Sequence, residues 1–310
     1  MVWRGDEYPL INFYFAGSSM KEADTYIEEN GLCRLFSYFN DKSNLKNRFQ
    51  KESVKGKLFV DSGAFTAWTK GISLDVDEYI NWLNTNEKYI HLAGQIDCIP
   101  GKPGSSVSYQ DRYEAAEKTW QNYLYMRSKL NNPDLIVYTF HLGEDYSFLE
   151  RALEQPYIKY IALGGTVGSS LKDKKDFFIK CFSCIRKSSH PEVKVHAFGM
   201  TSFSLIEQFP FYSVDSTSWI MTGCTGGIFS DWGIVQLGEK SKKCLNSIWH
   251  LSSEHLTELE QQIQNFGYTI EELSKDYKAR ELYNIKYLYN KSLTINISLD
   301  RKHLVRKQLF

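Results

Sequence analysis

The sequence predicts an α/β protein, specifically a (β/α)8 TIM-like barrel with a C-terminal helical appendage. Two observations lead to this fold class: eight short apolar runs rich in β-branched and aromatic residues recur along the chain, and helical segments separate them. Most of the runs are continuously apolar, as strands buried on both faces of a parallel sheet are. Eight strands close a barrel, whereas the alternative, an open doubly wound sheet, usually has about five or six.

The expected strands and helices alternate along the chain. The strands are expected at residues 10–16, 34–38, 57–61, 89–97, 135–141, 158–163, 193–198 and 212–215. The helices are expected at 19–30, 75–86, 109–130, 145–154, 171–187 and 202–208, with a weaker, polar one at 42–53. Ser19, Asp75 and Ser202 are the expected N-caps, because side chains of these types accept hydrogen bonds from the first free N–H groups of a helix.

The pattern changes after residue 215. Residues 223–238 are rich in glycine and aromatic residues and are expected to form a long ordered loop. Residues from 252 onward show helical periodicity. We therefore expect a catalytic barrel domain at residues 1–250 and a helical extension at 251–310 that packs on it. Part of this extension is expected to supply the eighth helix of the barrel.

Composition restricts the function classes. The formal net charge of +0 means that any nucleic-acid contact has to be local rather than spread over the chain. The hydrophobic content of 42% suffices for a sizeable core and excludes disorder for most of the chain. The N-terminus carries no apolar segment of the signal-peptide type, and no apolar run reaches the ~18 residues of a membrane span. We therefore expect a cytoplasmic protein with reduced cysteines.

Polar residues and glycines follow the expected strands, where barrel enzymes carry their functional groups. These residues are Asp61, Asp97, His141, Gly164, Gly165, His196, Gly199 and Asp215. Asp61 and Asp215 are a candidate pair for glycosyl chemistry, in which one carboxylate attacks or stabilises the anomeric carbon and the other handles protons. The alternative for both is a turn or capping role. Asp97 is a candidate third acid or base-recognition group, and His141 and His196 are candidates for binding substrate or metal. The alternative for all three is that local hydrogen bonds satisfy them.

No cofactor or metal is expected. Gly164 and Gly165 let a ligand approach bare backbone, but their surroundings match neither GxGxxG nor a phosphate loop with its lysine. Cys181 and Cys184 form a single CxxC on an expected helix, which favours a structural role. The zinc-ligand residue types at Cys224, Cys244, His250 and His255 have a spacing that matches no standard zinc signature.

Taken in order, the strand-end motifs resemble those of the tRNA-guanine transglycosylase superfamily. VDSGAF, YIALGG, VHAFGM and SVDSTSW stand in the order and spacing of the family's SDSGG-like strand end, its glycine pair, its HLMGVG-like strand and its FDCVLPTR-like segment. The resemblance covers about residues 55–220 and lies in the ordered series rather than in any single motif.

The resemblance implies a role for each position. Asp61 corresponds to the family's general acid/base, and Asp215 to the nucleophile that forms a covalent glycosyl-enzyme. Asp97 corresponds to the carboxylate that binds the purine edge, and His141 replaces a base-reading glutamine. Gly164 and Gly165 correspond to the backbone that lines the base pocket. The surrounding motifs add the remaining expected substrate-binding residues, which are Ser62, Gly63, Gly143, His196, Phe198 and Gly199.

Departures from the family indicate the acceptor polymer. SVDSTSW replaces the FDCVLPTR-like segment, and the family's zinc motif CxCxxC…H is absent. These departures, and a chain short for a bacterial tRNA enzyme, are more similar to the phage and DNA-modification branch, the DpdA-like DNA transglycosylases. The resemblance implies exchange of guanine in DNA for a 7-deazaguanine such as 7-cyano-7-deazaguanine, in the host cytoplasm if the protein is phage-encoded. Transfer RNA is the alternative acceptor.

Two further functions stay open as alternatives. One is a retaining glycoside hydrolase, and the other is a non-catalytic, nucleic-acid-binding member of the family, against which the presence of both Asp61 and Asp215 argues. A transglycosylase needs cationic contacts to phosphates. The candidate lysines are Lys172, Lys174, Lys175, Lys240, Lys242 and Lys243, with ordinary solvated surface as the alternative for each. No membrane contact is expected, and the oligomeric state is left open.

We predict that folding requires no zinc, because the sequence offers no complete ligand set. Protein treated with a chelator should keep its far-UV circular dichroism and its thermal midpoint. Stoichiometric zinc in elemental analysis, lost together with the fold on chelation, would contradict this prediction.

Overall fold

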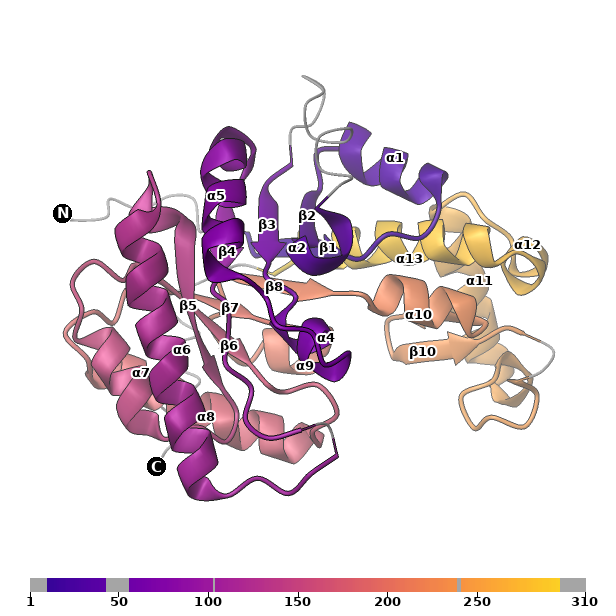
Figure 1. Ribbon diagram of the computed structural model, residues 1–310. Coiled ribbons are helices and arrows are strands. Elements are labelled where there is room, and N and C mark those ends of the chain that lie inside the picture. Colours follow the sequence, from indigo (N-terminus) through magenta and orange to yellow (C-terminus); the bar gives the residue numbers. More distant parts are fainter. Residues whose placement is uncertain (1–9, 43–55, 103, 239–240, 296–310) are drawn as a thin grey trace, which may run out of the picture.

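The chain folds into a closed barrel of eight parallel strands, as the sequence predicts (Figure 1). The computed structural model describes residues 10–42, 56–102, 104–238 and 241–295. In barrel order the strands are β1 Asn12–Ala16, β2 Cys33–Ser37, β3 Leu58–Asp61, β4 Leu92–Gly94, β5 Ile136–His141, β6 Tyr160–Gly164, β7 Lys194–Ala197 and β8 Ser213–Ser216. Pairing of β1 with β8 closes the ring, with Asn12 opposite Ser213 and Tyr14 opposite Asp215.

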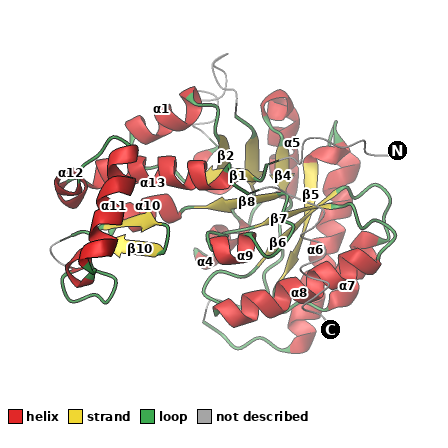
Figure 2. Ribbon diagram, turned by 180° about the vertical axis from the view of Figure 1, so that it is seen from behind, coloured by secondary structure: helices red, strands yellow, loops and turns green. Residues whose placement is uncertain are grey.

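Helices follow the strands and cover the outside of the barrel (Figure 2). They are α1 Lys21–Glu29, α2 Tyr38–Asp41, α4 Ala64–Thr69, α5 Val76–Asn86, α6 Tyr109–Lys129, α7 Tyr146–Leu153, α8 Leu171–Lys187, α9 Phe203–Ile206 and α10 Ser218–Cys224. Short 3-10 turns lie at Glu87–Tyr89, Pro133–Leu135 and Ile248–His250. The expected weak helix at 42–53 lies outside the described residues except for its first residue.

The expected N-caps have different outcomes. The Asp75 side chain accepts from the backbone N–H of Glu78 and caps α5, as predicted. Ser202 precedes α9 but makes no cap hydrogen bond there, because its hydroxyl bonds with that of Ser204. The prediction for Ser19 is wrong: α1 begins one residue later, and the Ser19 hydroxyl donates to a distant carboxylate on Glu281. A tertiary contact has therefore taken the side chain that the local pattern offered as a cap.

The core has two layers, one inside the barrel and one between the strands and the helices. Inside, Tyr14, Phe59, Val137 and Ala162 pack together and fill the barrel. Outside, each helix buries one apolar stripe; on α8 it consists of Phe177, Phe178, Cys181, Phe182 and Ile185. Cys181 is fully buried in this stripe, in agreement with the structural role expected for it.

The segment 223–238 is not the long loop that its composition suggests. After α10 it forms an antiparallel hairpin, β9 Gly227–Ser230 and β10 Gly233–Gln236. Ile228 and Val235 are buried although glycines surround them. The expectation was wrong because the glycine content hid two short strands, whose formation depends on packing against the C-terminal helices and not on local propensity.

The C-terminal helices are α11 Ser253–Asn265, α12 Ile270–Lys275 and α13 Tyr277–Ser292. Helix α13 packs against β1, α1 and α10, and it also supports β9. It therefore takes the place of the eighth barrel helix, and Figure 1 shows it beside β1 and below α1. In the described part of the chain no helix combines the length and the apolar character needed to cross a bilayer.

Asn284 connects α13 to the hairpin, which yields a prediction for stability. Its buried side chain accepts from Phe229 N at 3.0 Å and donates to the carbonyls of Trp219 and Gly227. Asn284→Leu preserves the shape but leaves the Phe229 N–H without its acceptor, at a cost of about 1–3 kcal/mol. Urea unfolding should show this loss, whereas the exposed Asn81→Leu should change stability by less than about 0.5 kcal/mol. Equal effects of the two substitutions would contradict the role of Asn284.

Candidate functional site

All eight strands run in parallel, so their carboxyl ends open on one mouth of the barrel. Every predicted site residue lies toward this end, in the second half of a strand or within three residues after it. Three carboxylates come from β3, from the segment after β4, and from β8. The charges of Asp97 and Asp215 both raise the pKa of Asp61, because a nearby like charge disfavours the ionised form of a carboxyl group.

Asp215 is held from one side only. Its Oδ1 accepts from His196 Nε2 at 3.1 Å and from the backbone N–H of Gly199 at 2.9 Å. The carbonyl of Asp215 also accepts from Met200 N, which ties β8 to the loop after β7. Asp215 as a residue is 6% exposed, and among the described residues no donor reaches its Oδ2. One oxygen is fixed, and the second is available to a ligand.

Asp61 is the last residue of β3 and is half-buried. Its Oδ2 accepts from Gly63 N at 3.1 Å, so the turn role considered from the sequence is present in the structure. Gly63 has a φ of +76°, and a Cβ there would lie 2.5 Å from that of Phe39. Burial, together with repulsion by Asp97 and Asp215, raises the pKa of Asp61 to about 7. Asp61 therefore both shapes the turn and exchanges a proton near neutral pH.

A histidine between two acids lies on the β5 side of the mouth. His141 Nε2 is 3.2 Å from Asp97 Oδ2, and His141 Nδ1 is 3.0 Å from Glu144 Oε1. Burial alone would lower the pKa of His141, but these two carboxylates raise it well above its ordinary value. The ring is therefore protonated at neutral pH, and both of its N–H groups donate to carboxylates. Gln95 Nε2 completes the cluster by donating to Asp97 Oδ1 at 3.0 Å.

Sequence reasoning missed Glu144 and Gln95. Glu144 stands three residues after His141, and its carboxylate also accepts from the His141 backbone N–H, so a turn brings the two together. Gln95 stands two residues before Asp97, in an irregular stretch after β4. The sequence offered one signal, namely that Glu144 and Gln95 are polar residues close to the predicted positions His141 and Asp97. Only the local backbone geometry, however, directs these two side chains toward the site.

The other predicted substrate-binding residues have varied environments. A Cβ at Gly164 would lie 2.9 Å from His141 Cδ2, so glycine is needed there to admit the histidine ring. Gly165 and Gly143 are exposed at the rim with positive φ. Ser62 is buried, and its hydroxyl accepts from Ala64 N inside the turn. Phe198 is half-buried, and its ring packs on those of Phe59 and His196.

The candidate zinc ligands do not come together. Cys224 Sγ donates to Glu281, His250 Nε2 lies 2.9 Å from the Lys242 carbonyl, and the His255 ring packs on Trp232. Within the described ranges no three histidine, cysteine or acidic side chains are grouped as metal ligands would be. Among the candidate phosphate-binding lysines, Lys240 lies outside the described residues, and Lys172, Lys242 and Lys243 are exposed.

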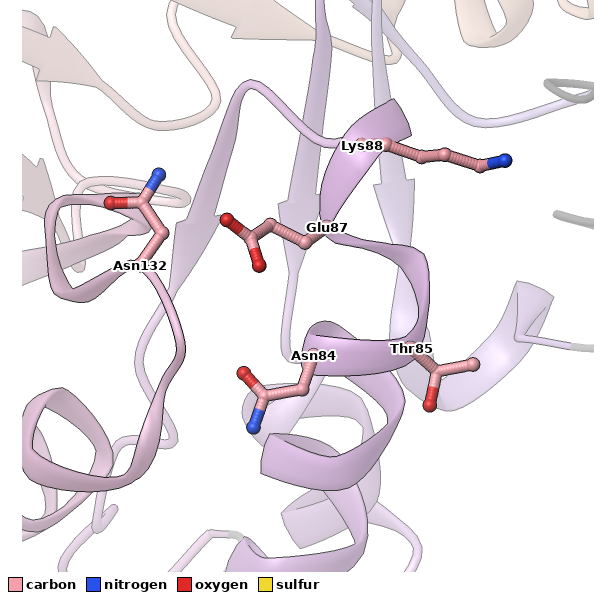
Figure 3. A pocket seen from close by; sticks show the side chains of 5 residues that line it. All are labelled: Asn84, Thr85, Glu87, Lys88 and Asn132. Atoms are coloured by element: carbon pink, nitrogen blue, oxygen red, sulfur yellow. The ribbon is translucent and has the colours of Figure 1, made fainter.

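Two surface hollows lie away from the three carboxylates. The one in Figure 3 is lined by Asn84, Thr85, Glu87, Lys88 and Asn132, at the end of α5 and before β5, which is the amino end of the strands. Its Asn84 side chain is engaged by the Lys129 carbonyl and the Asn131 N–H. The other lies between α7 and α8, against Tyr146, Asp176 and Lys180. Neither hollow includes Asp61, Asp97 or Asp215.

Neither protein-family models nor curated proteins give a match to this chain. The class of the protein is therefore defined by its own geometry: a TIM-like barrel whose mouth combines three carboxylates with an ion-paired histidine.

The raised pKa of Asp61 predicts a pH-dependent effect on stability. Between the ordinary value of 3.8 and the folded value of about 7, the folded protein keeps a proton that the unfolded chain loses. Stability therefore falls as the pH rises through this window. Asp61→Asn keeps the oxygen that accepts from Gly63 and removes the titration. It should increase the free energy of unfolding at pH 8, by about 1 kcal/mol or more, and have no such effect near pH 4.

Urea unfolding at the two pH values measures this difference. The exposed Asp176→Asn is a matched control and should shift neither value by more than about 0.5 kcal/mol. If Asp61→Asn lowers stability at pH 8, the carboxylate is not destabilised by its surroundings.

Proposed function

We propose that the protein is a base-exchange transglycosylase, which replaces guanine in nucleic acid with a 7-deazaguanine through a covalent aspartyl-glycosyl intermediate. The observation that supports this most directly is the different environment of two carboxylates at one mouth. Asp215 is held through Oδ1 with Oδ2 left available, whereas Asp61 has a pKa of about 7. A carboxylate with one oxygen available, beside a second carboxyl group that exchanges a proton near neutral pH, supplies a nucleophile and an acid/base.

In the first step, Asp215 Oδ2 attacks C1′ of the target nucleotide. The C1′–N9 bond breaks, and its electron pair leaves with guanine, which takes a proton from Asp61. A pKa of about 7 leaves a large fraction of Asp61 protonated at neutral pH. The N–H groups of His196 and Gly199 aim the nucleophile by holding the other oxygen.

In the second step, the incoming 7-deazaguanine gives its N9 proton to the Asp61 carboxylate. Its N9 electron pair then attacks C1′, the ester bond to Asp215 breaks, and the carboxylate is restored. Each displacement inverts C1′, so the configuration is retained overall. Asp61 returns to its protonated state, and the reaction needs no external oxidant, reductant or metal.

The cluster around Asp97 suits a purine edge. Guanine and 7-deazaguanine both present N–H groups at N1 and N2, which a carboxylate accepts. The protonated His141 ring and the Gln95 amide each donate to Asp97, so the position of its carboxylate is fixed. Asp97 thus selects bases with two adjacent donors.

The target base has to leave its stack to reach this mouth. Phe65 and Val167 are exposed on the segments after β3 and β6, where apolar contact with an extruded nucleotide is available. We propose DNA as the polymer, on the similarity of the motifs to the DNA-modifying branch, with tRNA as the alternative. Mass spectrometry of nucleosides from the DNA and the tRNA of cells that express the chain distinguishes the two.

The two aspartates should fail in different ways. Asp215→Asn should abolish the covalent adduct, because an amide cannot replace a carboxylate nucleophile, and base exchange should fall by several orders of magnitude. Asp61→Asn should lower exchange by about 10²–10⁴-fold, the usual value of general acid–base catalysis, while an adduct can still accumulate. The measurement is denaturing gel electrophoresis of protein incubated with DNA or tRNA and 7-cyano-7-deazaguanine.

Asp176→Asn, on the outside of the barrel, is the control and should exchange bases at the wild-type rate. An adduct that persists in Asp215→Asn and is absent in Asp61→Asn would reverse the two roles. Full exchange by both variants would exclude the mechanism. A wild-type protein that cleaves glycosides and does not bind deazaguanine would be a retaining hydrolase, and one that binds nucleic acid without exchange would be a non-catalytic member of the family.

A further inference from the structure

A chain of hydrogen bonds runs through the inside of the barrel to Asp215. Tyr160 Oη lies 2.6 Å from Ser213 Oγ, and Ser213 Oγ lies 2.6 Å from His196 Nδ1. The other ring nitrogen, Nε2, contacts Asp215 Oδ1 at 3.1 Å. Ser213, His196 and Asp215 face the same interior, because His196 is paired with Ser213 across β7 and β8 and Asp215 stands two residues further along β8.

Burial makes any unsatisfied hydrogen-bonding group in this chain of hydrogen bonds costly in free energy. His196 and Ser213 are both 0% exposed. The His196 ring packs among those of Tyr14, Phe59 and Phe198, and the hydrogen-bond partners of its nitrogens among the described residues are Ser213 and Asp215. A buried polar group without a partner costs about 1–3 kcal/mol, so the hydrogens of His196 and Ser213 have to be directed at acceptors.

Only one direction satisfies every group. If Tyr160 donates to Ser213 and Ser213 donates to Nδ1, then His196 is neutral, carries its hydrogen on Nε2 and donates to Asp215. In the reverse direction Nδ1 must donate to Ser213. Nε2 is then either unprotonated, so that its lone pair faces the Asp215 carboxylate, or protonated, so that an imidazolium is buried among aromatic rings. The hydrogen of the buried Ser213 hydroxyl would then have to point back at Tyr160, and the hydrogen of the half-buried Tyr160 would be left to solvent.

We propose that Tyr160 and Ser213 are positioning residues that hold His196 as the neutral Nε2–H tautomer, which occupies Asp215 Oδ1 and leaves Oδ2 as the attacking oxygen. This proposal rests on the proposed function for the part that concerns attack. The tautomer is argued from the hydrogen bonds and the burial, and it does not depend on the proposed function.

The neutral state matters most in the covalent intermediate. When Oδ2 bonds to C1′, the carboxylate becomes an ester and loses its charge. An imidazolium beside it would then be buried without a counter-charge, which is costly. A neutral ring only exchanges a charge-assisted hydrogen bond for an ordinary one. The hydrogen-bond chain therefore orients the nucleophile without raising the free energy of the covalent intermediate.

The test combines a spectroscopic with a kinetic measurement. In protein labelled with ¹⁵N-histidine, the signals of His196 are assigned by their loss in His196→Gln. The wild type should show one protonated nitrogen, Nε2, and one hydrogen-bonded unprotonated nitrogen, Nδ1. Tyr160→Phe frees the Ser213 hydroxyl to accept, so protonated Nδ1 should appear. Tyr138→Phe is the matched control, because this buried hydroxyl lies outside the barrel and has no described partner. It should leave the His196 signals unchanged.

The rate of adduct formation tests the positioning role. His196→Phe fills the same aromatic site without a donor and should slow adduct formation by about 10- to 100-fold, the range for a hydrogen bond to a charged group, with nucleic-acid affinity unchanged. His196→Gln restores an N–H near the Nε2 position and should recover the rate to within about tenfold of the wild type. A merely structural role predicts the opposite order, because phenylalanine preserves the packing and glutamine does not.

The outcomes separate the two proposals. An imidazolium or an Nδ1–H tautomer in the wild type at neutral pH overturns the positioning proposal, whatever the activity. The predicted tautomer, with its loss in Tyr160→Phe, supports the proposal even if no base exchange is found, in which case only the proposed function fails. Equal adduct rates in His196→Phe and the wild type would show that Asp215 needs no such donor.

Discussion

Parallel pairing of all eight strands is the constraint on which the rest of the structure depends. It sends every strand end to one mouth, so residues as far apart in sequence as Asp61 and Asp215 repel each other there. It also leaves the strands buried on both faces, which requires the apolar runs that dominate the sequence. Polar side chains inside the barrel are therefore tolerated only where they form hydrogen bonds with one another, as His196 and Ser213 do.

Electrostatic repulsion is the second constraint. Asp97 and Asp215 both disfavour the charged form of Asp61, and the three carboxylates receive different hydrogen-bond donors. Asp97 receives a protonated histidine and an amide, Asp215 receives two N–H groups on one oxygen, and Asp61 receives backbone N–H groups of its own turn. Burial and this repulsion together raise the pKa of Asp61 to about 7, so Asp61 keeps a proton close to neutral pH.

The barrel and the positions at its mouth could be predicted from the sequence, because continuous apolar runs separated by amphipathic helices leave few alternatives. Strand ends were less certain: the run at 89–97 contains only the three residues of β4, with a 3-10 turn before it and irregular backbone after it. Glu144 and Gln95 could not be assigned, because their roles depend on local turns. Ser213 and Tyr160 could not be assigned, because their roles depend on the register between strands. The β9–β10 hairpin was missed because its support comes from α13, which is distant in sequence.

The closure of the barrel joins the two ends of the described chain. Asn12 N bonds to the Tyr212 carbonyl, and Ile11 N bonds to the carbonyl of Ile295. During synthesis β1 emerges first, yet one of its edges stays unpaired until β8 has been made, and α13 covers it later still. Contacts so distant in sequence slow folding, and an unpaired strand edge invites association with other chains. The nascent chain thus carries an open strand edge from the synthesis of β1 until β8 and then α13 have been made, and shielding of that edge in this interval protects it from association with other chains.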